Sequence, residues 1–186
     1  MSAGHAAHAG GPRPLLSLRP VETQAQVERA AALAGEIWRE YYPQVIGREQ
    51  TEYMIANLQS AAAIGEQLRA GMSYFLLTRV PTALNDSAAD VGYAAVEARA
   101  PALFISKLYL LAEARGSGLG QRALHALGDH ARALGLGQLE LTVNRHNALA
   151  LRAYERFGMQ IVGTQYAEIG GGYAMDDYVL RISLVS

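Results

Sequence analysis

No cysteine occurs among the 186 residues of this chain, which excludes disulfide bonds, thiolate–zinc sites and a catalytic thiol. Charge is also scarce: charged residues make up 18% of the chain and the formal net charge is −1. The composition therefore gives no reason to expect a nucleic-acid or anionic-membrane partner. No apolar run approaches the roughly 20 residues that span a membrane. The length suits one domain with a real core, so we expect a soluble globular protein of the cytoplasm.

The N-terminal stretch and the histidines give no sign of a signal peptide or a metal site. Residues 1–14, "MSAGHAAHAGGPRP", lack the basic-then-apolar layout of a signal peptide. We predict a flexible tail there and one domain over residues 15–186. Two of the five histidines lie in the tail, and the spacing of His125 and His130 does not place both on one helical face as in HExxH. We expect no metal ion.

Hydrophobic periodicity predicts a succession of strands and helices. Short apolar or alternating runs typical of strands cover residues 15–21, 72–80, 91–99, 102–111, 138–143, 159–168 and 173–184. Apolar residues at helical spacing cover residues 27–41, 47–71, 119–134 and 147–157. Pro43 should end the first helix, because proline disfavours helix in the residue before it, and the second should break near Ile64–Gly65. The order is β-α-α-β-β-β-α-β-α-β-β.

The connections between these segments predict an α/β fold with a mixed sheet of about seven strands. Strands 72–80 and 91–99 are joined by a short polar turn, so they should be antiparallel neighbours. The succession of strand 102–111, a helix and strand 138–143 predicts a right-handed parallel crossover.

A glycine-rich segment, "RGSGLGQR", follows the fourth predicted strand and opens a helix. A Walker P-loop is excluded because no lysine follows the last glycine. A dinucleotide fingerprint is disfavoured, because Gln121 takes its third glycine position and Glu140 lies inside a strand. Two interpretations remain for the pattern Arg115-x-x-Gly118-x-Gly120. Its backbone N–H groups could hold a pyrophosphate at the helix N-terminus, or the glycines could only form a tight turn.

A second motif begins at Asn147, where "NALALRAYERFGM" holds Ala150, Tyr154, Phe157 and Gly158 at fixed spacing. Asn147 suits a helix N-cap and Gly158 a helix stop. With the glycine segment, this order resembles the GCN5-related N-acetyltransferase (GNAT) superfamily. Its motifs are Q/R-x-x-G-x-G/A after the fourth strand and N-x-x-A-x-x-x-Y-x-x-x-G-F on the helix after the fifth. The resemblance implies a single-domain α/β GNAT fold with helices on both faces of the sheet.

The resemblance also implies direct transfer of an acetyl group from acetyl-CoA to an amine, without a covalent enzyme intermediate. The missing cysteine and the missing GxSxG elbow agree with this. Pantetheine amides would pair with a strand backbone, in a splay between the two parallel strands. The implied cofactor-binding residues are Leu108, Tyr109, Leu110, Arg115, Gly116, Ser117, Gly118, Leu119, Gly120, Gln121, Asn147, Ala150 and Tyr154. Family members often dimerise, so a homodimer is also an expectation.

Acetyl transfer to an amine needs a base and a proton donor. A primary amine has a pKa near ~10.4, so only roughly one molecule in a thousand is nucleophilic at neutral pH. The resemblance assigns protonation of the leaving thiolate to Tyr154, which could otherwise simply pack in the core. Glu97 is our candidate base, although its strand could instead face solvent. Ser106 stands where many relatives have glutamate and could hold a water, and Glu113 and Glu168 are weaker candidates.

The acceptor is less well defined by the sequence. The segments "KLYLLAEARGSGLG" and "VGTQYAEIGGGYAMDDYVLRISL" are similar to bacterial spermidine/spermine N-acetyltransferases. Gly163, Gly170 and Asp177 match the residue pattern of those enzymes, whereas Gln165 and Ala167 differ from it. Carboxylates that could serve a polyamine are Glu36, Glu40, Asp176 and Asp177. We therefore predict a small amine acceptor such as a polyamine.

Two other functions stay open at this level. The aromatic residues Trp38, Tyr41, Tyr42 and Tyr53 could form acceptor walls or plain core. A groove lined by tyrosine rather than by acids would favour acetylation of a peptide or protein N-terminus or lysine. A catalytically silent acyl-CoA-binding module would be favoured if no carboxylate or ordered water faced the thioester.

Overall fold

A sheet of seven strands, in the order β1-β2-β3-β4-β5-β7-β6, runs through the computed structural model, which describes residues 15–81 and 87–184. The predicted tail, residues 1–14, lies outside the described residues. The strands are β1 (Leu15–Pro20), β2 (Ser73–Val80), β3 (Ala89–Arg99), β4 (Ala102–Leu110), β5 (Gln138–Asn144), β6 (Gln160–Gly170) and β7 (Tyr173–Ser183). As predicted, β2 and β3 are antiparallel and β4 and β5 are parallel.

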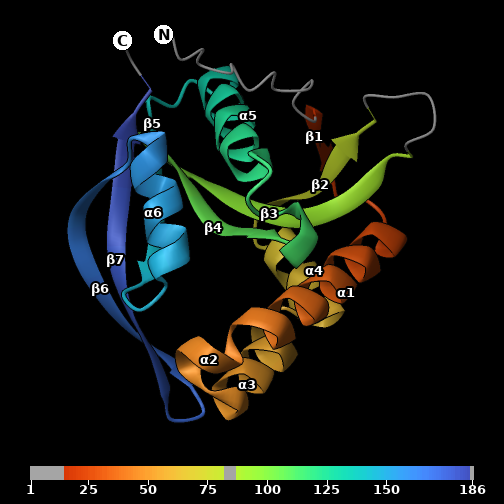
Figure 1. Cartoon of the computed structure of the whole chain (residues 1–186), viewed down its shortest axis with the longest axis vertical. Helices are drawn as coiled ribbons and strands as arrows, with labels where there is room; N and C mark the ends of the chain where they lie inside the picture. The colour runs from red at the N-terminus through yellow and green to blue at the C-terminus, as the bar shows by residue number, and fades with distance from the viewer. Residues whose placement is uncertain (1–14, 82–86, 185–186) are drawn as a thin grey trace, which may run out of the picture.

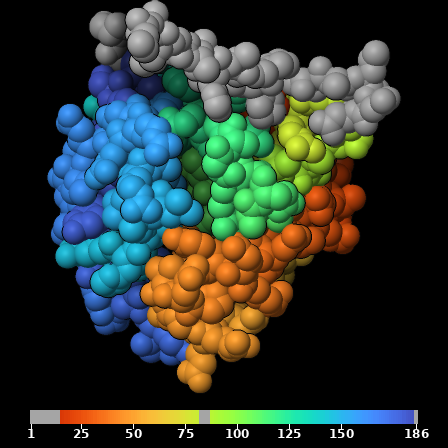
Figure 2. Space-filling model, viewed as in Figure 1, coloured from red at the N-terminus to blue at the C-terminus, as the bar shows by residue number. Residues whose placement is uncertain are grey.

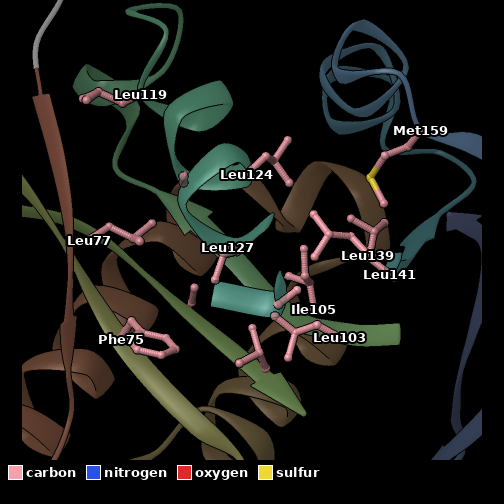
Figure 3. Packing of buried hydrophobic residues seen from close by; sticks show 14 of the residues in the cluster. Phe75, Leu77, Leu103, Ile105, Leu119, Leu124, Leu127, Leu139, Leu141 and Met159 are labelled. Atoms are coloured by element: carbon pink, nitrogen blue, oxygen red, sulfur yellow. The ribbon is translucent and has the colours of Figure 1, made fainter. Parts of the chain in front are cut away.

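Helices cover both faces of this sheet (Figure 1). One face carries α1 (Gln24–Tyr41), α2 (Pro43–Ile46), α3 (Arg48–Leu58) and α4 (Ala61–Arg69). The other carries the short 3-10 helix η1 (Ala112–Ala114), α5 (Leu119–Ala133) and α6 (Ala148–Phe157). Figure 3 shows Leu124 and Leu127 of α5 packed toward Leu103 and Ile105 of β4. The predicted fold class is therefore confirmed, and each face has its own buried cluster.

The helical region before β2 differs from the prediction. Pro43 does follow the end of α1, but it also begins the short helix α2, where proline's fixed φ is tolerated. The predicted break near Ile64–Gly65 is wrong: the chain breaks at Gln59–Ser60 instead. Ser60 is the reason, because its Oγ accepts a hydrogen bond from the backbone N–H of Ala63 and so starts α4.

The two parallel strands separate after their first four paired residues. Pairing runs from Ala102–Gln138 to Ile105–Leu141 and then stops. Opposite β3, Val96 pairs with Ile105 but Ala95 pairs with Lys107, so Ser106 is the extra residue of a β-bulge. A bulge bends its strand and increases the local twist. The bulge therefore coincides with the start of a splay that opens the middle of the sheet.

Candidate active site

A cavity of about 730 Å³ lies at this splay. Its lining includes the free end of β4, the end of β5, the N-terminal part of α5 and residues of α1, α6, β6 and β7. Figure 2 shows one face of the molecule, on which α2–α3 (orange), the segment around η1 (green) and α6 (blue) come together. We call the part on the α5–α6 face the cofactor half and the part on the α1–α4 face the acceptor half.

Most of the residues predicted to bind the cofactor line the cavity. They are Leu108, Tyr109, Leu110, Arg115, Gly116, Gly120, Asn147, Ala150 and Tyr154. They come from a strand end, a turn and two helix starts, and the splay brings these elements together. The backbone of β4 has no partner strand on this side, so its N–H and C=O groups are free to pair with an extended ligand.

Three of the remaining predicted residues build the loop rather than the surface of the cavity. Ser117 Oγ donates a hydrogen bond to the carbonyl oxygen of Ala114 at 2.6 Å. Leu119 is buried in the core, 2% exposed. Gln121 Nε2 donates to the carbonyl oxygen of Ala153 at 2.8 Å and so joins α5 to α6. These contacts hold the glycine turn against the second motif.

The glycine turn is open to a ligand. Gly116 and Gly118 have φ values of +73° and +89°, a region that side chains rarely adopt. A Cβ placed on either residue would meet nothing within 4 Å. Gly118 is the N-cap of α5, so the first N–H groups of that helix point out of the turn with the positive end of the helix dipole. The turn therefore has the shape of an anion site as well as of a tight turn.

Three arginines line the cavity near this turn. Arg115 is anchored, because its Nε donates to the carbonyl oxygen of Leu110 at 3.0 Å and its Nη2 lies 2.6 Å from Oε2 of Glu40. Arg152 and Arg156 reach the cavity from α6. Their spacing of four residues places both on one helical face, a sequence signal that we did not use. They add positive charge to the lining of the cavity.

Tyr154 lines the cavity from α6 and is half-buried. Burial raises the pKa of its hydroxyl to about 12, so the group stays protonated and can donate. Asn147 is the N-cap of α6, as predicted: its Oδ1 accepts from the N–H of Ala150 at 3.1 Å. The same oxygen accepts from Tyr41 Oη at 3.0 Å, which ties α1 to the start of α6.

The aromatic residues of α1 line the acceptor half. Trp38 and Tyr42 stack with ring centroids 4.1 Å apart, and Trp38 Nε1 donates to Tyr93 Oη at 3.2 Å. Both rings are buried and also line the cavity, so Trp38 and Tyr42 belong to the core, and their role as acceptor walls stays a prediction. Tyr53 differs, because it is not part of the lining and its hydroxyl donates to the carbonyl oxygen of Ile169 at 3.1 Å.

Asp177 is the single carboxylate among the described residues that line the cavity. It is 7% exposed, and its Oδ1 has no hydrogen-bond partner in the described part of the chain. The pKa of this carboxyl is raised to about 6, mainly by burial and to a lesser degree by the charge of Asp176, while a hydrogen bond with the Thr142 side chain partly offsets the rise. The sequence indicates Asp177 as a carboxylate for polyamine binding and as a position shared with the spermidine/spermine enzymes, but not as a base. Nothing in a single sequence marks it as buried.

The other base candidates lie elsewhere. Glu97 is not part of the lining, and its Oε2 accepts from Arg99 Nε and Nη2 at 2.9 and 2.6 Å on the surface. Ser106 lines the cavity, whereas Glu113 and Glu168 are exposed and do not. The placement of Glu97 therefore does not support its predicted role as base.

Residues 34–159 match the model of the acetyltransferase (GNAT) family. The chain belongs to this family. It is therefore an acyltransferase that uses acetyl-CoA, and the open glycine turn, the free β4 edge and the arginines fit that cofactor. Among the described residues, no group of three His, Asp or Glu side chains could hold a metal ion.

Solved structures of GNAT enzymes share the fold. A GCN5-related N-acetyltransferase from Rhodopseudomonas palustris has a TM-score of 0.72 at 19% identity, covering 95% of this chain and 99% of that one. PaiA N-acetyltransferase from Thermoplasma acidophilum, solved with coenzyme A, has a TM-score of 0.67 at 17% identity, covering 91% and 99%. YncA from Salmonella typhimurium, solved with acetyl-CoA, has a TM-score of 0.57 at 17% identity, covering 91% and 94%.

The curated proteins contain no significant match to this chain. In the part of the chain that the structure describes, no helix is long and apolar enough to cross a membrane.

Proposed function

We propose that this GNAT enzyme acetylates the primary amine of a small acceptor molecule, with Asp177 as base and Tyr154 as proton donor. One observation carries the proposal: both side chains line a single cavity, Tyr154 from the α5–α6 face and Asp177 from the α1–α4 face. Acetyl-CoA supplies an activated acetyl group as a thioester. An amine that enters from the acceptor half would meet this group at the splay between β4 and β5.

Different residues of the chain would then bind acetyl-CoA and transfer the protons. The unpaired backbone of Leu108–Leu110 would hold the pantetheine arm, and the N–H groups at the start of α5 would hold the pyrophosphate. The Asp177 carboxylate, ionised at neutral pH because its pKa is about 6, would attract the ammonium form and take its proton, directly or through water. The Tyr154 hydroxyl would protonate the leaving thiolate.

The charge of the acceptor half bears on the polyamine prediction. A polyamine carries several positive charges and needs several carboxylates. Of the four carboxylates considered for that role, Glu40 pairs with Arg115, Asp176 pairs with Arg145 and Glu36 is exposed outside the lining. Only Asp177 remains, so the cavity favours an acceptor with one amine over a polyamine.

The test is acetyl-CoA turnover, followed by thiol release, against spermidine, spermine, free amino acids, simple alkylamines and short peptides. Calorimetric binding of CoA is measured alongside. We expect the highest turnover with small monoamines and little with polyamines, while the short peptides test the alternative that the aromatic lining of Trp38, Tyr41 and Tyr42 favours. Preference for a polyamine or a peptide would contradict the proposed acceptor class. Tight CoA binding without turnover of any amine would instead support a silent acyl-CoA-binding module.

A further inference from the structure

Lys107 is the only lysine in the chain, and it lines the cavity. It is 8% exposed. The other basic side chains that line the cavity are arginines near the cofactor half. A buried lysine in the acceptor half is therefore unusual for this molecule and calls for a physical reason.

The neighbours of Lys107 fix the direction of its side chain. Tyr74, Ala95 and Lys107 form one row across β2, β3 and β4, so all three side chains lie on the same face. The small Ala95 lets the outer two approach, and Lys107 Nζ lies 5.6 Å from the centre of the Tyr74 ring. Nζ also donates to Gln67 Oε1 at 2.8 Å.

The neutral amide of Gln67 does not balance the positive charge of Lys107, and both of its polar atoms already form hydrogen bonds. Its Oε1 also accepts from Tyr74 Oη at 2.6 Å, and its Nε2 donates to the carbonyl oxygen of Leu58 at 3.1 Å. An ammonium has three N–H donors, and one of them is used here. Among the residues that the structure describes, no carboxylate forms an ion pair with Lys107. Burying an unpaired ammonium is costly, so a ligand with negative charge would relieve that cost.

Asp177 provides the opposite charge on the other side of the splay. It sits in a row with Asn144 and Gln165 across β5, β7 and β6. Tyr109, two residues after Lys107, and Met175, two residues before Asp177, both pack against the α1–α4 cluster. Because side chains alternate along a strand, Lys107 and Asp177 face this same layer. The acceptor half thus has a cation on the β4 side and an anion on the β7 side.

We propose that the acceptor carries a carboxylate as well as its primary amine, as a small amino acid does, and that Lys107 binds the carboxylate. The inference rests on the proposed function for the amine, which would lie at Asp177. The acceptor half is also lined by Met54, Met72, Ile169 and Met175, so the body of the acceptor should be apolar. A lone ammonium with one amide beside it suits a carboxylate better than a phosphate, which needs more donors.

The activity test uses pairs of acceptors that differ only in the carboxylate: phenylalanine with 2-phenylethylamine, methionine with 3-(methylthio)propylamine, and ω-amino acids with alkylamines of equal length. In the wild-type enzyme we expect kcat/KM to favour the carboxylate-bearing member roughly tenfold or more, since one charged hydrogen bond is at stake. Lys107→Met should remove that preference, because it should lower kcat/KM for the carboxylate-bearing member much more than for the simple amine. Lys107→Arg should keep part of it.

Arg132→Met serves as the matched control, because it also removes one positive charge but from the exposed end of α5, where Arg132 pairs with Asp129. It should keep the preference. Equal losses of turnover on both members of each pair in Lys107→Met would overturn the inference, because the effect of Lys107 would then not depend on the carboxylate. An equal wild-type rate for both members would also overturn it.

A second readout does not depend on turnover. Protein labelled with [13Cε]lysine should give one side-chain signal, because the chain has one lysine. We expect phenylalanine to shift this signal and 2-phenylethylamine to leave it unchanged. A shift without turnover of any amine would retain the carboxylate site and reject the proposed function. No shift with any carboxylate-bearing acceptor would reject the site itself.

Discussion

The two halves of the cavity are built in different ways. The cofactor half consists largely of backbone: the free edge of β4, the turn at Gly116 and Gly118, and the first N–H groups of α5. The acceptor half consists of side chains from segments far apart in the sequence, with Gln67, Lys107 and Asp177 on three different elements. Backbone recognition tolerates changes of side chain, whereas recognition by a few buried charges does not.

This difference explains why one fold can keep its cofactor and change its acceptor. A pyrophosphate and two amides are satisfied by N–H and C=O groups that the turn and the splay provide in any sequence that folds this way. The acceptor half instead depends on which buried positions carry charge. We therefore expect substitutions in the acceptor half to change rate and choice of amine, and substitutions in the cofactor half to change affinity for acetyl-CoA.

The largest expected effect is that of Asp177→Asn. Loss of a general base lowers kcat/KM by roughly 10²–10³-fold, while CoA affinity measured by calorimetry should stay unchanged. In the wild-type enzyme, kcat/KM should rise with pH through about 6, because burial raises the Asp177 pKa to that value, and the variant should lack this rise. Asp176→Asn is the control: it removes an exposed neighbouring carboxylate that raises the pKa of Asp177, so the rise should move slightly to lower pH.

Stability gives the same substitution a second, independent readout. The folded protein holds the Asp177 proton between the ordinary pKa of 3.8 and about 6, where the unfolded chain is ionised. The free energy of unfolding therefore falls as pH rises through this interval. Asp177→Asn removes the ionisation and should raise stability above pH 6 by about 1–2 kcal/mol. A variant that is less stable at pH 7.5 would argue against an uncompensated buried carboxylate.

The cofactor half could be predicted because its signals are local in the sequence. The motif from Arg115 to Gly120 and the motif from Asn147 to Gly158 each lie on one turn and one helix, so the resemblance to the family could assign their residues from local sequence. The start and stop signals of helices are local in the same way: as predicted, Asn147 caps α6, and Gly158 ends this helix in the left-handed region. Gln121, predicted as a contact, instead ties α5 to α6, which spacing could not reveal.

The acceptor half could not be predicted because its residues meet only in the folded sheet. Glu97 and Asp177 look alike as strand carboxylates, and only the folded structure separates them: Glu97 lies on the surface beside Arg99, while Asp177 is 7% exposed and lines the cavity. The position of the helix break was predicted wrongly for a related reason. A single hydrogen bond from the backbone N–H of Ala63 to the Ser60 side chain starts a new helix where the apolar pattern runs on without interruption.

A smaller effect is expected from Tyr154→Phe. A thiolate similar to cysteine, with a pKa near ~8.5, already leaves fairly well, so loss of its proton donor should lower kcat by roughly 10–100-fold. The Kd of CoA should change little, because the ring remains. Tyr166→Phe, at an exposed position on β6, is the matched control and should have no effect. Unchanged kcat in Tyr154→Phe would show that the hydroxyl does not protonate the thiolate and that the residue only packs.

The smallest expected effect tests the cofactor half directly. Gly120→Val adds a branched side chain to a regular helical residue of α5 that lines the cavity, where a Cβ would lie 3.6 Å from Leu110 Cδ1, so the free protein tolerates it. Valine should stabilise the helix by up to about 0.5 kcal/mol relative to glycine and yet weaken acetyl-CoA binding roughly tenfold, because a side chain larger than the glycine or alanine of the motif would occupy space that a pyrophosphate needs. Gly118→Val is a poorer test, since φ at Gly118 is +89° and valine would strain the turn itself.

Gly65→Val, on α4 and outside the cavity lining, is the control for Gly120→Val: it should bring the gain in stability without the loss of affinity. A rise in the midpoint of thermal unfolding together with a weaker Kd, in the first variant only, would identify the turn as the anion site. A more stable Gly120→Val protein with unchanged affinity would mean that the glycines serve the turn alone. Acetyl-CoA would then be held mainly by the strand edge and the arginines of α6.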